Sequence, residues 1–148
     1  GHYILQNGDI SNTLNFIIKG AVKKFFIDHT GKEHIMMLGL ESWWAGDMSS
    51  FITQTPAAYN IECIEATQVI RIHYDDHEQL LEELPKMEKY FRKVTERAYV
   101  AAQDRIIRNF ALSAKERYLY FIWKLEIDVL TKEFQKKLIE ELLITQQI

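Results

Sequence analysis

The strongest constraint on the fold is a segment without glycine or proline that runs from Lys86 to Phe110. Within it, apolar or small residues recur at spacings of four and three, namely Met87, Phe91, Val94, Ala98 and Ala101. This seven-residue repeat is typical of a helix that packs along one seam. A helix of about 24 residues is roughly 36 Å long at 1.5 Å per residue. We therefore expect one long helix after Pro85.

The residues before this segment have the pattern of β-structure. Short runs rich in Ile, Val, Phe and Met are separated by turn residues and cover 15–18, 21–28, 33–38, 59–63 and 67–72. The second and third runs flank a four-residue loop that contains Gly31, which indicates a hairpin. Short strands at a spacing of about ten residues predict a sandwich or a small barrel.

Helix signals begin near residue 74. Acidic residues at 75 and 76 precede an apolar run, as at the start of a short helix. Pro85 is placed to end that helix or to begin the next. Ser113 and Glu116 have the spacing of a capping box, which predicts a further helix. A last amphipathic helix is expected over 134–143.

Charge and composition divide the chain and limit its class. Residues 1–85 carry five basic and twelve acidic side chains, residues 86–110 seven and three, and residues 111–148 six of each. We predict three parts, at 1–84, 85–111 and 112–148. The 47% of hydrophobic residues suffices for a core, and no apolar run approaches the roughly 18 residues of a membrane span. A single cysteine, Cys63, allows no internal disulfide. We expect a cytoplasmic protein without a membrane partner.

The order of these parts, and several segments, resemble the catabolite-activator/FNR (CRP/FNR) type of transcription regulator. The segments are Ile4–Asp9, Phe16–Gly20 and Gly46–Phe51, while Leu112–Tyr118 looks like the hinge of that family. The resemblance implies an α+β fold: a cyclic-nucleotide-binding-type antiparallel β-roll (jelly roll), a long dimerisation helix, and a partial, truncated winged helix-turn-helix. It also implies a homodimeric, ligand-sensing regulator.

The resemblance also locates a ligand pocket. In the family a glycine–acid pair and a short helix hold the ligand phosphate and ribose, and Gly46-Asp47 fits that pair with Asp in place of the usual Glu. The expected pocket residues are Trp44, Gly46, Asp47, Met48, Ser49, Ser50, Ala57, Ala58 and Tyr59. Trp43, Trp44 and Tyr59 flank this region. They could form an aromatic, apolar pocket for a different ligand, but we favour a structural role in which they fill the core of the roll or cover its end.

The expected pocket lacks a cation. The phosphate-binding arginine of the family would fall near 56–58, and no Lys or Arg occurs between Lys32 and Arg71, where five acidic residues lie. Loss of a charged hydrogen bond costs about 1.5–3 kcal/mol, whereas a helix N-terminus contributes about 0.3–2 kcal/mol. We therefore expect weak or no binding of cyclic AMP. A cation from a partner subunit, on the basic helix, is the exception.

The long helix and the tail carry the remaining expectations. The seam of Met87, Phe91, Val94, Ala98 and Ala101 is the expected dimer interface, and the alternative is a helix packed only against its own roll. The tail resembles the start of a helix-turn-helix, with Thr145, Gln146 and Gln147 as DNA-binding residues. Ile139 and Leu143 depart from that pattern, and three residues after Thr145 are too few for a recognition helix. Either the chain is part of a longer regulator or its DNA-binding part has decayed.

Catalysis finds little support in the sequence. The five histidines form no metal-binding signature, and the closely spaced histidines of a cupin-type metal enzyme are missing. We expect no metal, no cofactor and no enzymatic activity. The alternative function is a dimeric small-molecule-binding or interaction module without DNA binding.

Overall fold

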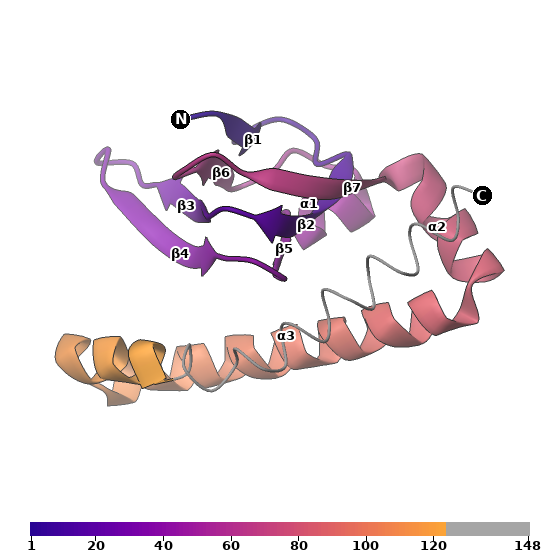
Figure 1. Ribbon diagram of the computed structural model, residues 1–148. Helices are drawn as coiled ribbons and strands as arrows, with labels where there is room; N and C mark the ends of the chain where they lie inside the picture. The colour runs from indigo at the N-terminus through magenta and orange to yellow at the C-terminus, as the bar shows by residue number, and fades with distance from the viewer. Residues whose placement is uncertain (124–148) are drawn as a thin grey trace.

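The computed structural model describes residues 1–123, which form a β-roll followed by helices (Figure 1). The strands are β1 (Tyr3–Leu5), β2 (Thr13–Lys19), β3 (Val22–Ile27), β4 (Glu33–Gly39), β5 (Trp44–Ala45), β6 (Asn60–Cys63) and β7 (Gln68–His73). The helices are α1 (Met48–Thr53), α2 (Tyr74–Glu83) and α3 (Pro85–Ala111), and a further helical segment covers 114–123. All five strands predicted from the sequence are present, as β2, β3, β4, β6 and β7.

The strands form two antiparallel sheets. One has the order β1-β6-β3-β4 and the other β5-β2-β7. The predicted hairpin joins β3 to β4, and its loop is held by the Asp28 carboxylate, which accepts hydrogen bonds from the backbone N–H groups of Thr30 and Lys32. Gly20 has a φ of 109°, and a Cβ there would lie 2.7 Å from the carbonyl oxygen of Ala66, so this tight turn requires glycine.

Strand β2 is buried on both faces because the fold has two cores. Its alternate side chains point to opposite faces. Phe16 faces an outer core shared with the helices, whereas Ile17 faces the interior between the sheets. Both side chains are completely buried. This explains why Phe16, Ile17 and Ile18 follow one another in the strand instead of alternating with polar residues.

Helix α3 has the predicted bounds, with Pro85 in its first turn. The prediction that its heptad seam faces a second subunit is wrong at the first two positions. Met87 and Phe91 are buried in the outer core of their own chain. Farther along the same seam, Val94 and Ala101 are half-buried and Ala98 is exposed. The spacing defined one helix face correctly, but spacing contains no information about which partner covers it.

The capping box is confirmed at the start of the segment 114–123. The backbone N–H of Glu116 donates to Ser113 Oγ at 3.2 Å, and the N–H of Ser113 donates to Glu116 Oε1 at 3.1 Å. The guanidinium of Arg108 on α3 lies 4.0 Å from the ring centre of Tyr120. Thr145, Gln146 and Gln147, together with the predicted helix over 134–143, lie outside the described residues.

His77 introduces a pH dependence into the outer core. Its ring lies edge-on to Phe51 at 5.2 Å and to Phe91 at 5.7 Å, so it ties α2 to α1 and α3. Burial lowers the pKa of His77 below its ordinary value of 6.5, and the charge of Glu78 opposes this effect only in part.

We expect the free energy of unfolding to fall as the pH drops from about 7.5 to about 5.5. The unfolded chain takes up the His77 proton first, so stability declines below the ordinary pKa of 6.5 and continues to fall toward the lower, folded value. Urea unfolding at both pH values measures this slope. His77→Phe should give a shallower slope, and equal slopes in the two proteins would contradict the assignment.

Candidate functional site

The predicted glycine–acid pair forms a closed loop at the start of α1. Asp47 is the N-cap of this helix, and only 3% of the residue is exposed. Its Oδ1 accepts a hydrogen bond from the N–H of Ser50 at 3.1 Å, and its Oδ2 accepts one from the N–H of Ala58, also at 3.1 Å. One carboxylate therefore joins the helix N-terminus to the segment that precedes β6.

A second set of hydrogen bonds fixes the loop to the rest of the roll. Ser50 Oγ donates to the carbonyl oxygen of Thr55 at 2.6 Å and accepts from the N–H of Ser11 at 2.8 Å. Ala57 is buried in the interior core. The structure thus brings together Gly46, Asp47, Ser50, Ala57 and Ala58, as the sequence predicted. Met48 and Ser49, which were also predicted here, are exposed on α1.

The expectation that no cation lies at this loop is wrong. Lys24, on β3, donates from Nζ to the carbonyl oxygen of Gly46 at 2.9 Å. The same Nζ lies 4.5 Å from the ring centre of Tyr59. Burial lowers the pKa of Lys24, the charge of Asp47 opposes this, and the charge of Arg105 on α3 adds to it. Lys24 is 22 residues away from Gly46 in the sequence and reaches it only because the roll folds β3 against this loop. The sequence around Gly46 therefore gives no sign of this cation.

Trp44 does not line the predicted pocket. Its ring packs against Phe16 at 5.2 Å and against Phe91 at 4.9 Å, and its Nε1 donates to the hydroxyl of Tyr90 at 3.2 Å. Trp44 therefore joins the roll to α3, in agreement with the structural alternative. Burial raises the pKa of Tyr90, and the Trp44 hydrogen bond works against this. Tyr59, by contrast, stays at the loop and is half-buried beneath Lys24.

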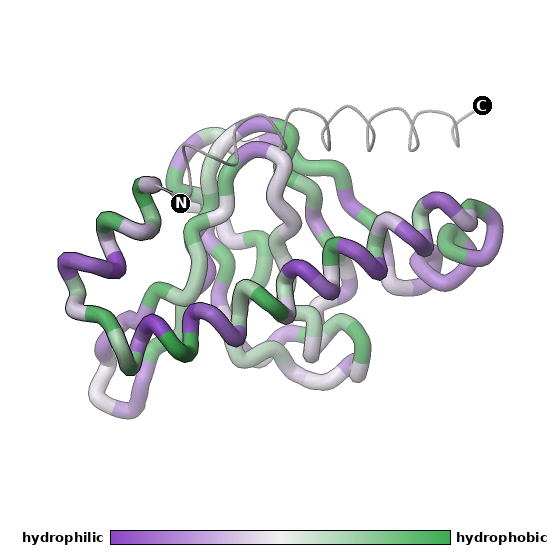
Figure 2. The backbone as a smooth tube through the Cα atoms, turned by 90° about the horizontal axis from the view of Figure 1, so that it is seen from below, coloured by the Kyte–Doolittle hydropathy of each residue, from purple (hydrophilic) through white to green (hydrophobic). Residues whose placement is uncertain are grey.

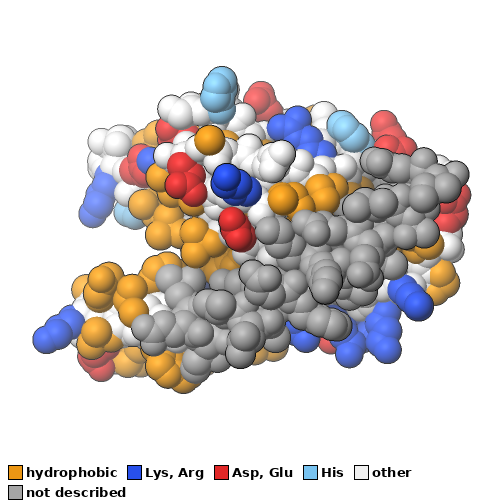
Figure 3. All heavy atoms as spheres, in the orientation of Figure 1, with side chains coloured by type: hydrophobic (Ala, Val, Ile, Leu, Met, Phe, Trp, Pro, Cys, Tyr) orange, Lys and Arg blue, Asp and Glu red, His pale blue; other side chains and the backbone are white. Residues whose placement is uncertain are grey.

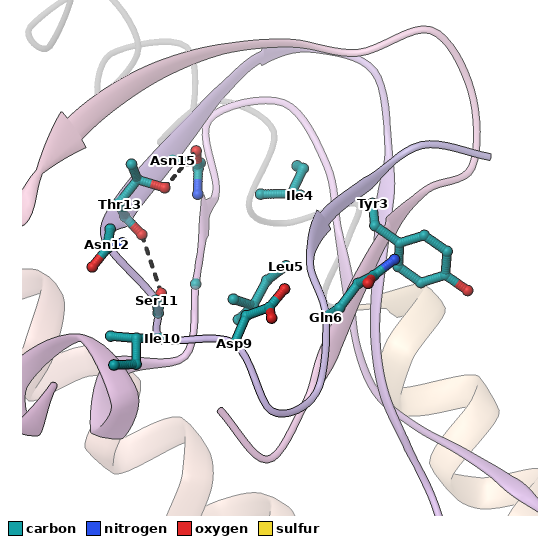
Figure 4. A pocket seen from close by; sticks show the side chains of 11 residues that line it. Tyr3, Ile4, Leu5, Gln6, Asp9, Ile10, Ser11, Asn12, Thr13 and Asn15 are labelled. Atoms are coloured by element: carbon teal, nitrogen blue, oxygen red, sulfur yellow. Dashed lines mark hydrogen bonds between the residues drawn. The ribbon is translucent and has the colours of Figure 1, made fainter. Parts of the chain in front are cut away.

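A separate recess of about 270 Å³ lies between β1 with its following loop and the beginning of β2 (Figure 4). Its lining is mostly polar and includes Asp9, Ser11 and Asn15. It reaches the predicted ligand loop only at Gly46 and contains neither Asp47 nor Ala58. The Asn15 side chain donates to the carbonyl oxygen of Ala45 at 3.1 Å, so it has a structural partner.

Residues 1–123 show neither a metal-binding cluster nor a candidate membrane span. In this part of the chain no three His, Cys, Asp or Glu side chains come together in a way that would ligate a metal ion. Here, too, no helix combines the length and the apolar character that a bilayer crossing demands. Cys63 is a free, half-buried thiol on β6.

Comparison with known sequences gives the family. The sequence model of the cyclic nucleotide-binding domain matches residues 1–84. An anaerobic regulatory protein of Haemophilus influenzae is 26% identical over 124 residues, which are 82% of this chain and 47% of that protein. The transcriptional activator protein anr of Pseudomonas aeruginosa is 26% identical over 122 residues, 82% of this chain and 49% of that protein. The chain thus spans about half the length of these relatives.

Solved structures share the fold at lower identity. The catabolite activator protein of Thermus thermophilus superposes with a TM-score of 0.63 at 21% identity, over 72% of this chain and 49% of that one. The c-di-GMP-responsive global regulator CLP of Xanthomonas campestris gives 0.67 at 16% identity, over 84% and 62%. The resemblance to CRP/FNR-type regulators is confirmed, and the chain belongs to the cyclic nucleotide-binding domain family.

Proposed function

We propose that this chain is the ligand-sensing and dimerising part of a CRP/FNR-type transcription regulator that binds cyclic AMP weakly or not at all. The regulatory role is supported by the relatives, which are named as a regulatory protein and a transcriptional activator. Ligand binding would bias a dimer between two arrangements of its DNA-binding ends, as a population shift.

The observation that carries the weak affinity for cyclic AMP is the position of the Asp47 carboxylate. Its two oxygens already accept the N–H groups of Ser50 and Ala58, so these two donors are not free to bind a ligand phosphate. A cyclic phosphate would have to displace a buried carboxylate or lie beside it, and like charges at close range repel. Lys24 does not remove this obstacle, because its Nζ is bonded to Gly46 and lies near the same carboxylate.

Isothermal titration of the purified chain with cyclic AMP and cyclic GMP tests this proposal. We expect no saturable heat at micromolar ligand, because the arginine is missing near 56–58 and the loop donors are occupied. Loss of the charge-assisted contact alone weakens binding by about tenfold or more. Micromolar binding of either nucleotide to the roll would overturn the proposal that this pocket binds cyclic nucleotides weakly or not at all.

We also propose a homodimer, but through a different face of α3 from the predicted seam. Figure 2 shows α3 lying across the roll with hydrophobic positions recurring along it. The large apolar residues that are exposed in its second half are Tyr99, Val100, Ile106, Ile107 and Phe110. Tyr99, Ile106 and Phe110 follow each other at spacings of seven and four, which is the pattern of a coiled-coil seam. We call these five residues the α3 stripe.

DNA binding belongs to the complete protein in this proposal. A mobility shift of the complete gene product on promoter DNA, which weakens with rising salt, would support it. A product that dimerises and binds a ligand but never shifts DNA would instead favour the small-molecule-binding module.

A further inference from the structure

The recess between β1 and the beginning of β2 has an apolar side and a polar side (Figure 4). On the side of β1, Leu5 is buried and belongs to the interior core. On the side of β2 lie Ser11, Thr13 and Asn15, and Asp9 lies in the connection between the two strands. No residue of α2 or α3 lines the recess. It is therefore a different place from the Asp47 loop and from the surface that α3 covers.

Two buried side chains on the polar side have unused hydrogen-bonding capacity. Ser11 and Asn15 are 2% and 1% exposed. The Asn15 amide donates to the carbonyl oxygen of Ala45 at 3.1 Å and accepts from the Thr13 hydroxyl at 3.4 Å. An amide has two N–H donors and two acceptor positions, so the described residues satisfy half of them. The Ser11 hydroxyl donates to the carbonyl oxygen of Thr13 at 3.3 Å and has acceptor positions to spare. Because buried polar groups favour full hydrogen bonding, a polar ligand here would supply the remaining partners.

Asp9 supplies the only charged side chain among the residues that line the recess. Its backbone is fixed, because its N–H donates to Gln6 at 3.1 Å and its carbonyl oxygen accepts from Ala57 at 2.8 Å. Within residues 1–123 its carboxylate forms no salt bridge. Figure 3 shows that Lys and Arg side chains of the face in view gather instead along the first half of α3. An anion in the recess would meet repulsion without a counter-ion, which argues against phosphates and carboxylates.

The size and the donor–acceptor character of the recess narrow the ligand further. Its volume of about 270 Å³ is just below the roughly 300–1,000 Å³ of ordinary ligand pockets, so the ligand is small. A hydroxyl group both donates and accepts, so it matches a carboxylate and an amide alike. An ammonium group only donates and would leave the second N–H of the Asn15 amide without an acceptor.

We propose that this recess binds a neutral polyhydroxy compound of the size of a monosaccharide. Its hydroxyl groups bind Asp9, Ser11 and Asn15, and its carbon skeleton packs against Leu5. Hydrogen bonds to the Asp9 carboxylate are charge-assisted and stronger than neutral ones. The inference goes beyond the proposed function, because the affinity of the Asp47 loop for cyclic nucleotides does not enter it.

Amide chemical shifts of the isotope-labelled chain, recorded during titration with D-glucose and with D-ribose, test the proposal. We expect saturable shifts at Asp9, Ser11 and Asn15 in the millimolar range, and none along α3. D-glucuronate carries a carboxylate in place of the CH₂OH group of D-glucose. It should bind more weakly by about fivefold, the factor that two like charges about 4 Å apart give even in bulk water.

Methylammonium chloride tests the alternative of a cation site. It has a positive charge without hydroxyl groups, and we expect no saturable shifts at the recess. Methylammonium that binds as tightly as the sugars would overturn the neutral class of ligand, and D-glucuronate that binds as tightly as D-glucose would overturn the role of Asp9. Absence of saturable shifts with both sugars would overturn the recess as a polyol site.

Two variants and a control locate the site. Asp9→Ala should weaken sugar binding by about tenfold or more, because it removes a charged acceptor, and Ser11→Ala by about threefold or more. Asp76→Ala is the matched control, since it removes an exposed carboxylate from α2, away from the recess. It should leave sugar binding unchanged, and circular dichroism establishes that each variant is folded. Equal losses in Asp9→Ala and Asp76→Ala, or undiminished binding in both Asp9→Ala and Ser11→Ala, would contradict the placement of the ligand.

Discussion

Replacing Phe91 with alanine is expected to cost about 3–5 kcal/mol of unfolding free energy, the range for a buried Phe→Ala change. Phe91 is 8% exposed, and its ring lies against Trp44 at 4.9 Å and against His77 at 5.7 Å. The cavity left by the missing ring would remove the contacts that hold α3 against the roll and α2. Because domains of this size are stable by about 5–15 kcal/mol, the loss is a large share of the total. Urea unfolding monitored by circular dichroism measures it.

Phe110→Ala is the matched control for this prediction. It is the same chemical change on the same helix, but Phe110 is 89% exposed. In dilute protein, where the chain is monomeric, we expect Phe110→Ala to change the unfolding free energy by less than about 0.5 kcal/mol. Similar losses in the two variants would contradict the placement of Phe91 in the outer core.

Phe110→Asp is expected to raise the dimer dissociation constant by about 100-fold or more. The α3 stripe has Phe110 as its most exposed member, and a carboxylate there would be buried against the partner helix without a counter-ion. A penalty of about 2.8 kcal/mol corresponds to a factor of 100. Sedimentation equilibrium over a range of protein concentrations measures the constant.

Two comparisons make the dimer prediction specific. Asn109→Asp adds the same charge one residue away and outside the α3 stripe, so it should leave the dissociation constant unchanged. Val94→Asp tests the seam expected from the sequence, which the structure turns toward the roll. If Val94→Asp dissociates the dimer and Phe110→Asp does not, the interface follows the original seam. A wild-type chain that stays monomeric at high concentration would refute both interfaces.

The elements with a local signal were predictable. Strands β2, β3, β4, β6 and β7 follow from apolar runs between turns, and α3 from a long segment without glycine or proline. Capping at Ser113 follows from a four-residue pattern. Two short elements were harder: β1 has three residues and β5 has two, too few to show a period. They exist because longer neighbours pair with them, β6 with β1 and β2 with β5.

The sequence predicts the loop of the candidate site, but it does not predict the cation that lies against this loop. Gly46, Asp47 and Ser50 lie within five positions of each other, so a motif reveals them. Lys24 reaches this loop from β3, where its Nζ donates to the carbonyl oxygen of Gly46. Side chains that meet only after two sheets and a helix have packed leave no sequence pattern of short range.

Local periodicity in the sequence thus determined the kinds of element, their order and the family resemblance, because strand and helix periods are properties of neighbouring residues. Tertiary structure alone decided what each face contacts. It placed Met87 and Phe91 in the core of their own chain, left the α3 stripe exposed, and set Lys24 against the Gly46 carbonyl. The physical reason is that burial and charge depend on distances in space, which the sheet register and the helix position fix together.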